Sequence, residues 1–169
     1  MKREAILQAA IKLEEDGRKF YLAMAGDAEN DLARRTFESF AKDEANHIAW
    51  IKETLGGGGN IAPADDAANA VYASVKKIFA RVPASKKGKL GTSKDELKAL
   101  KIAMGKEEAS IKAYRKWADQ STDAEIAELF TSLAAVERVH RDLLANTREY
   151  LEKTGDWFMV QEQWSFDGG

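Results

Sequence analysis

Four long stretches of the chain carry apolar residues at steps of three and four, the spacing that places them on one face of an α-helix. These stripes cover residues 7–24, 37–51, 100–114 and 126–144. A glutamate interrupts the first and third stripes, and a glutamate followed by a histidine interrupts the second and fourth. The pattern therefore predicts four amphipathic helices that direct these carboxylates and imidazoles into a shared core.

Capping signals define the ends of the first two helices. The first helix should run from near the N-terminus to about Ala25. The second should begin at Asn30 or Asp31, both of which suit an N-cap, and it should end at Leu55 because residues 56–59 are all glycine. Together these helices form a first helical hairpin.

The third and fourth helices each follow a capping-box sequence. Residues 93–96 are Ser-Lys-Asp-Glu and should open a helix that reaches about Asp119. Residues 122–125 are Thr-Asp-Ala-Glu and should open a helix that continues to about Lys153. These two helices form a second hairpin.

A longer segment of different composition joins the two hairpins. It contains both prolines, Pro63 and Pro83, which flank a short helical pattern over about residues 66–79. Such a segment can return the chain along the bundle, so that the second and third long helices run parallel, as in ferritin-like bundles. The expected fold class is all-α, a ferritin-like four-helix bundle with one long crossover containing a short helix. We expect the bundle to span residues 1–154, and the aromatic tail at residues 155–169 to pack on it or on a partner chain.

Composition narrows the class of protein. A chain of 169 residues is long enough for one domain with a full hydrophobic core. Its net charge of −2 gives no general attraction to nucleic acid, and no apolar run is long enough to span a membrane. The N-terminus leads directly into an amphipathic pattern instead of a signal sequence, so a cytoplasmic location is expected. With no cysteine, a disulfide, an iron–sulfur cluster and a thiolate iron site are excluded.

One short pattern occurs twice: a glutamate and, 30 residues later, the sequence Glu-x-x-His. The copies are offset by 93 residues, and alignment of residues 14–47 with 107–140 gives ten identities in 34 positions. Both histidines of the chain belong to this pattern. The first copy is Glu14, Glu44 and His47, and the second is Glu107, Glu137 and His140. The repeat indicates an internal duplication of a helical hairpin.

These six residues have the chemistry of a metal centre. A buried carboxylate must be protonated, paired or bound to metal, because an isolated buried charge is too costly. Residues three apart share a helix face, so each Glu-x-x-His can hold one ion, and Glu14 and Glu107 can bridge the two ions. Two such ions lie about 3.5–4 Å apart in comparable sites. Iron or manganese suits these ligands, zinc also takes such sites, and a buried polar network without metal is the alternative.

The chain resembles the rubrerythrin-like branch of the ferritin-like superfamily over nearly its whole length. Residues 14–21 have the form Glu-x-x-Gly-x-x-Phe-Tyr, and residues 37–47 contain Phe37 and end in Asp-Glu-Ala-Asn-His. These segments are similar to the first-helix and second-helix signatures of that branch. The resemblance implies that the six repeated residues bind two irons and that Tyr21 and Tyr114 hydrogen-bond to ligand carboxylates. It also implies a non-haem di-iron oxidoreductase, whose diferrous site reacts with hydrogen peroxide or dioxygen in defence against oxidative stress.

Two departures from the family pattern bear on this activity. Full-length rubrerythrins carry a rubredoxin-like Cys₄ iron domain that feeds electrons to the site, and a chain without cysteine has none, so an external electron donor is implied. They also carry an extra glutamate one turn after the third-helix ligand, where this chain has Ser110. Two other functions remain open: ferrous oxidation for iron storage or transfer, and a non-catalytic metal-binding module.

The number of large aromatic residues favours a homodimer. Trp50, Trp117 and Phe79, with the tail aromatics, exceed what one core of this size needs, and apolar surface outside a bundle usually marks an interface. The repeat also allows a helix-swapped dimer, in which residues 1–55 of one chain pair with residues 93–153 of another.

Overall fold

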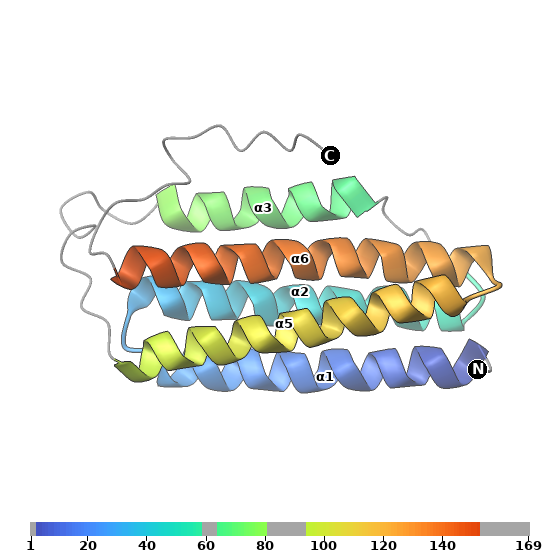
Figure 1. The fold of residues 1–169 in the computed structure, drawn as a ribbon, viewed down its shortest axis with the longest axis horizontal. Helices are drawn as coiled ribbons and strands as arrows, with labels where there is room; N and C mark the ends of the chain where they lie inside the picture. The colour runs from blue at the N-terminus through green and yellow to red at the C-terminus, as the bar shows by residue number, and fades with distance from the viewer. Residues whose placement is uncertain (1–2, 59–63, 81–93, 153–169) are drawn as a thin grey trace.

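The computed structural model describes residues 3–58, 64–80 and 94–152, and every regular element within those ranges is an α-helix (Figure 1). The helices are α1 (Arg3–Asp27), α2 (Asp31–Leu55), α3 (Ala64–Ala80), α5 (Lys94–Gln120) and α6 (Ala124–Glu152). The all-α class is confirmed, and the ends of the long helices lie close to their predicted positions. The tail at residues 155–169, the residue Ser93 and the side chain of Phe79 lie outside the described part.

Two antiparallel hairpins, α1–α2 and α5–α6, lie side by side and form a four-helix bundle (Figure 1). The helices α2 and α5 run in the same direction, as predicted for a bundle with one long crossover. The helix α3 belongs to that crossover, and it packs outside the bundle against α6 and α2. This architecture confirms the ferritin-like bundle and brings the faces of all four long helices to one core.

Local sequence sets the ends of α2. The side chain of Asn30 accepts hydrogen bonds from the backbone N–H groups of Leu32 and Ala33 at 2.9 and 3.2 Å, which makes Asn30 the N-cap. At the other end, the N–H groups of Gly57 and Gly58 donate to the carbonyls of Thr54 and Glu53. This pair of bonds forms a Schellman motif, which requires the left-handed φ of 84° found at Gly57.

The helix α6 begins one residue later than its capping-box sequence predicts. Asp123, not Thr122, is the residue before the helix, and its carboxylate accepts from the N–H groups of Glu125 and Ile126 at 3.1 and 3.4 Å. A capping box would use Thr122 and Glu125 as partners. The carboxylate of Asp123 takes this role because it reaches the free N–H groups of the first turn from its own position.

Two apolar clusters occupy the bundle, one toward each end. One cluster contains the buried apolar residues between positions 21 and 41 of the first hairpin, with others from α3, α5 and α6, including Phe37, Phe40 and Leu143. The other contains buried apolar residues between positions 6 and 11 of α1 and between 126 and 134 of α6, together with Ile51 and Tyr114. Trp50 is half-buried and packs against both clusters. The repeated glutamates lie near the middle of each long helix, and this middle section therefore lies between the two apolar clusters.

Within the described ranges, none of the helices has the length and apolar character needed to cross a membrane.

Candidate metal centre

All six repeated glutamates and histidines meet in the middle of the bundle. Each of the six residues is at most 4% exposed, although charged side chains are seldom buried this deeply unless they are paired or bind metal. Their ligand atoms fall into two groups, and within each group they lie within 4.8 Å of one another. The groups are Glu14, Glu44, His47 and Glu137, and Glu44, Glu107, Glu137 and His140. The sequence repeat thus brings together two adjoining sites, each suited to one metal ion.

The two sites share a pair of carboxylates. Glu44 of α2 and Glu137 of α6 belong to both groups, whereas Glu14 and Glu107 each belong to only one. This arrangement differs from the expectation that Glu14 and Glu107 bridge the two ions. Helical periodicity gives the face on which a side chain lies, but it does not give the depth to which that side chain reaches between the other helices.

Both histidines turn the same ring nitrogen toward the carboxylates. The Nδ1 atom of His47 lies 3.0 Å from Glu14 Oε2 and 3.2 Å from Glu137 Oε1. The Nδ1 atom of His140 lies 3.0 Å from Glu137 Oε2, and its Nε2 atom lies 3.2 Å from Asp43 Oδ2. The imidazoles are therefore held in defined orientations, with Nδ1 as the atom available to a metal ion.

The two tyrosines tie the hairpins together. The hydroxyl of Tyr21 on α1 donates to Glu107 Oε1 on α5, and the hydroxyl of Tyr114 on α5 donates to Glu14 Oε1 on α1. Both tyrosines are at most 1% exposed. Each hairpin thus supplies the hydrogen bond that orients a carboxylate of the other hairpin.

The environment divides the carboxylates into two kinds. Burial, with the nearby charge of Glu44, raises the pKa of Glu14 well above its ordinary value. Burial, with the nearby charge of Glu137, does the same to the pKa of Glu107. Burial also acts to raise the pKa of Glu137, but hydrogen bonds from His140 and His47 outweigh it and hold that pKa well below its usual range. Burial and the neighbouring carboxylates therefore favour the protonated forms of Glu14 and Glu107, and a bound cation would favour their ionised forms.

Carboxylates also keep the two imidazoles charged. Burial alone would lower the pKa of His140, but hydrogen bonds to Asp43 and Glu137 raise it to about 9. Burial likewise opposes the charged form of His47, yet the charge of Glu14 and hydrogen bonds to the surrounding carboxylates raise its pKa well above the ordinary value. The acidic cluster thus favours positive charge at its centre. A metal cation bound there would be favoured for the same reason.

A glycine makes room for one of the shared carboxylates. A Cβ atom at Gly17 would lie 3.3 Å from Glu44 Cδ and 3.4 and 3.5 Å from its two oxygens. The carboxylate of Glu44 therefore occupies space that a side chain on α1 would take. Buried oxygen and imidazole ligands of this kind fit iron, manganese or zinc.

The motif and the geometry agree with a comparison of families. A family model described as Rubrerythrin matches residues 5–148, which is most of the chain. The chain belongs to the rubrerythrin family.

A hypothetical protein from Pyrococcus furiosus has a similar structure to this rubrerythrin-family chain. The TM-score is 0.62 and the sequence identity 19%, over 92% of this chain and 93% of that chain. At this identity the likeness supports the bundle fold alone. No curated protein matches the chain in sequence.

Two residues of this rubrerythrin-family site were not identified from the sequence. Asp43, which contacts His140, lies directly before a ligand on its helix, and it has no acidic counterpart in the second copy of the repeat. Gly17 lies on the predicted stripe, and a glycine in the interior of a long helix is itself a signal of close packing. The sequence shows both residues, but their roles depend on which side chains the neighbouring helices place beside them.

The glutamates next to the ligands have a different role. Glu108 is 42% exposed and pairs with Arg141 at 3.1 Å, and Glu15 is half-buried. These residues flank the centre without joining either group of ligand atoms, because they lie one step off the apolar face.

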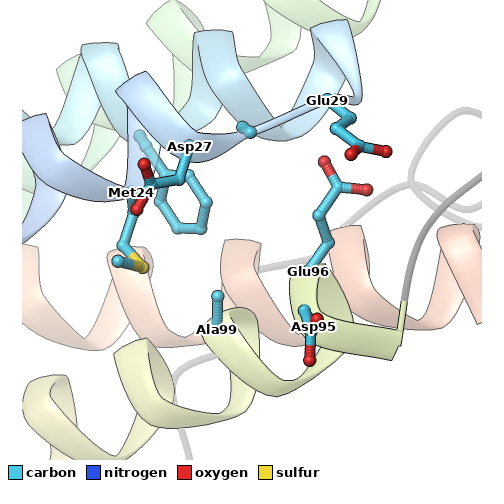
Figure 2. Close-up of a pocket in the computed structure, with 8 residues that line it drawn as sticks. Met24, Asp27, Glu29, Asp95, Glu96 and Ala99 are labelled. Carbon is cyan, nitrogen blue, oxygen red and sulfur yellow. The ribbon is translucent and has the colours of Figure 1, made fainter.

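A hollow of about 390 Å³ lies at one end of the bundle, outside the six-residue cluster. Its wall includes Asp27, Glu29, Asp95 and Glu96, and Figure 2 shows Glu96 extending from α5 toward Glu29 at the turn between α1 and α2. Phe37 also lines the hollow and stacks on the Tyr21 ring at a centroid distance of 6.1 Å. An acidic surface depression thus connects through two aromatic rings to the carboxylate of Glu107.

Proposed function

We propose that this protein is a di-iron oxidoreductase of rubrerythrin type, whose diferrous site reacts with hydrogen peroxide or dioxygen in cytoplasmic defence against oxidative stress. The observation that carries this proposal is the pair of overlapping four-ligand groups that share Glu44 and Glu137. Membership in the rubrerythrin family supports the same conclusion.

The overlap of the two groups suggests how the ions would be held. Glu14 and His47 would serve one ion, Glu107 and His140 would serve the other, and the shared carboxylates would contact both. A pair of bound ferrous ions would supply the two electrons that, with two protons, reduce one hydrogen peroxide to two waters. Manganese or zinc ions fit the same donors, although zinc has no redox chemistry to offer.

The chain's own residues prepare this site in three ways. The hydroxyls of Tyr21 and Tyr114 fix the orientation of the two unshared carboxylates. The apolar clusters on either side exclude bulk water, which strengthens the electrostatic interactions between the ligands. Gly17 leaves the space that the shared carboxylate of Glu44 fills.

The reducing electrons come from an external donor in this proposal. The chain contains no cysteine, so it has no thiolate iron centre of its own to pass electrons to the site. A small electron carrier protein or an equivalent reductant would return the ferric site to its ferrous form after each reaction.

One observation favours a second function, the binding and oxidation of ferrous ions for storage or transfer. The acidic hollow at the end of the bundle would attract cations, and its Phe37 is in ring contact with Tyr21 beside the centre. A non-catalytic module, stabilised by metal, is the remaining alternative.

The deciding experiment loads the protein anaerobically with ferrous iron and mixes it in a stopped-flow instrument with peroxide or, separately, with dioxygen. We expect about two irons per chain and faster oxidation by peroxide. Faster oxidation by dioxygen, with a ferric mineral accumulating, would favour iron handling over peroxide reduction. Loading without any oxidation would favour the non-catalytic module.

Adjacent glutamates provide a matched pair of variants for the ligand assignment. Glu107 is 2% exposed in the cluster, whereas Glu108 is paired at the surface. Glu107→Ala should lose at least one of the two irons, and Glu108→Ala should keep both. Metal analysis after iron loading distinguishes them, and full iron content in the Glu107→Ala protein would contradict the assignment.

We also propose that the protein forms a homodimer. Leu22 on α1 and Ile102 on α5 are 50% and 47% exposed, which leaves apolar surface on the outside of the bundle. All six candidate ligands can come from one chain, so a swapped arrangement is not needed to complete the site. Light scattering at micromolar concentration tests the proposal, and a mass near 18.7 kDa would refute it.

A further inference from the structure

The two histidines of the centre differ in the contacts of their Nε2 atoms, which face away from the other ligands. In His140, Nδ1 faces the carboxylate of Glu137 at 3.0 Å and Nε2 lies 3.2 Å from Asp43 Oδ2 on the neighbouring helix α2. The side chain of Asp43 is 15% exposed, so this contact is largely shielded from water. The ring of His140 is also stacked on Phe40 at a centroid distance of 4.2 Å. One imidazole is therefore fixed from both of its nitrogens and from one face.

The internal duplication does not repeat this support for His47. At the repeat offset of 93 residues, the position of Asp43 is occupied by Val136, a fully buried member of an apolar cluster. In the helices that the structure describes, every carboxylate within ion-pair distance of His47 approaches Nδ1, and none approaches Nε2. The ring of Trp50 lies beside His47, at a centroid distance of 5.5 Å.

A carboxylate behind a ligand histidine changes how that histidine binds metal. It accepts the N–H of the outer nitrogen, which fixes the tautomer with a lone pair on the inner nitrogen and makes that nitrogen a stronger donor. Loss of such a partner typically weakens metal binding about 10- to 100-fold. The other ligands of the two metal positions are nearly symmetric. The contact of Asp43 with His140 is therefore the main difference that can make their metal affinities unequal.

We propose that the two metal positions are unequal, and that the position served by His140 binds its ion more tightly and fills first because Asp43 orients that histidine. Asp43 acts as a positioning residue, since it touches the imidazole and belongs to neither group of ligand atoms. This inference rests on the proposed metal centre, and it adds an order of filling that the repeat alone would not predict.

Calorimetric titration with Co²⁺, an air-stable probe with visible absorption bands, tests the inequality directly. The intact protein should bind in two steps whose affinities differ by about 10- to 100-fold. Asp43→Ala should weaken the tighter step by a similar factor, and Asp43→Asn, which keeps an oxygen acceptor, should restore part of the loss. The control Glu38→Gln removes one charge from an exposed position of the same helix and should leave both steps unchanged.

A mutant cycle assigns the steps to their positions. In a His47→Ala background, one binding step should remain, and Asp43→Ala should weaken it and shift its cobalt absorption bands. In a His140→Ala background, the added Asp43→Ala change should have no effect on the remaining step. Circular dichroism checks that each variant keeps its helices, so that a change in affinity is not a loss of fold.

Three results would overturn the inference while leaving the metal centre intact. These are equal affinities in the intact protein, an unchanged tighter step in Asp43→Ala, and a weakening by Asp43→Ala in the His140→Ala background. If the intact protein bound no cobalt, iron or manganese, the metal centre itself would be refuted, and the inference with it.

Discussion

The glycine beside the shared carboxylate provides a sharp test of the centre. In Gly17→Ala, the new methyl group would lie 3.3 Å from Glu44 Cδ, so the carboxylate must move by a few tenths of an ångström. Because Glu44 belongs to both groups of ligand atoms, this movement affects both metal positions. We expect the variant to bind both ions more weakly while it keeps its fold.

The expected magnitudes separate stability from metal binding. Replacing glycine by alanine inside a helix favours the helix by about 1 kcal/mol. In a chain of this size, 1 kcal/mol corresponds to a rise of about 2–4 °C in Tm. The close contact with Glu44 offsets part of that gain, so the metal-free variant should be close to the wild type or slightly more stable. Displacement of a metal ligand should still weaken metal binding by about tenfold or more.

A matched control is available on the third long helix. Gly105 is an exposed helical glycine, and a Cβ atom there would have no neighbour within 4 Å. Gly105→Ala should therefore gain the full helical contribution and bind metal normally. The measurements are thermal unfolding in the presence of a chelator and calorimetric titration with metal. Unchanged metal affinity in Gly17→Ala would show that the close approach to Glu44 has no part in binding.

Two further predictions concern the tyrosines and pH. Tyr21→Phe removes the hydroxyl that donates to Glu107 and leaves a buried acceptor unpaired, so the free energy of unfolding should fall by about 1–3 kcal/mol, and denaturant titration should detect this. The His140 pKa of about 9 exceeds the ordinary 6.5, so its stabilising charge is complete below pH 6.5 and is lost as the pH rises through 9. The metal-free protein should then lose up to about 3 kcal/mol of stability between those values. In the metal-loaded protein the free energy of unfolding should instead rise with pH, since metal binding requires deprotonated ligands. Denaturant titrations from pH 6 to 9, with and without metal, compare the two forms.

The sequence predicted the bundle well because each of its signals is local. The apolar stripes and the glycines after Leu55 depend on neighbouring residues in one helix, and the structure has the helices they predict. The convergence of the six repeated residues also followed from local periodicity together with duplication. The sharing of Glu44 and Glu137 did not, because it depends on how far each side chain reaches past the other three helices.

The contact between Asp43 and His140 was hidden for the same reason. It joins α2 to α6, two helices far apart in the sequence, and Asp43 lies one step off the main stripe of its helix. The cap of α6 shows a smaller limit of pattern reading. Thr122 and Asp123 both suit an N-cap, and only the path of the turn selects Asp123.

The reciprocal bonds of Tyr21 and Tyr114 preserve the symmetry of two molecules within one chain. A single hairpin with this sequence pattern cannot orient its own glutamate in this way, since the tyrosine that does so belongs to the other copy. Such a hairpin alone would need a second, identical copy to complete these bonds, and any substitution would then change both halves at once. Within one chain the two halves can differ, and they do at paired positions, Asp43 against Val136 and Gly17 against Ser110.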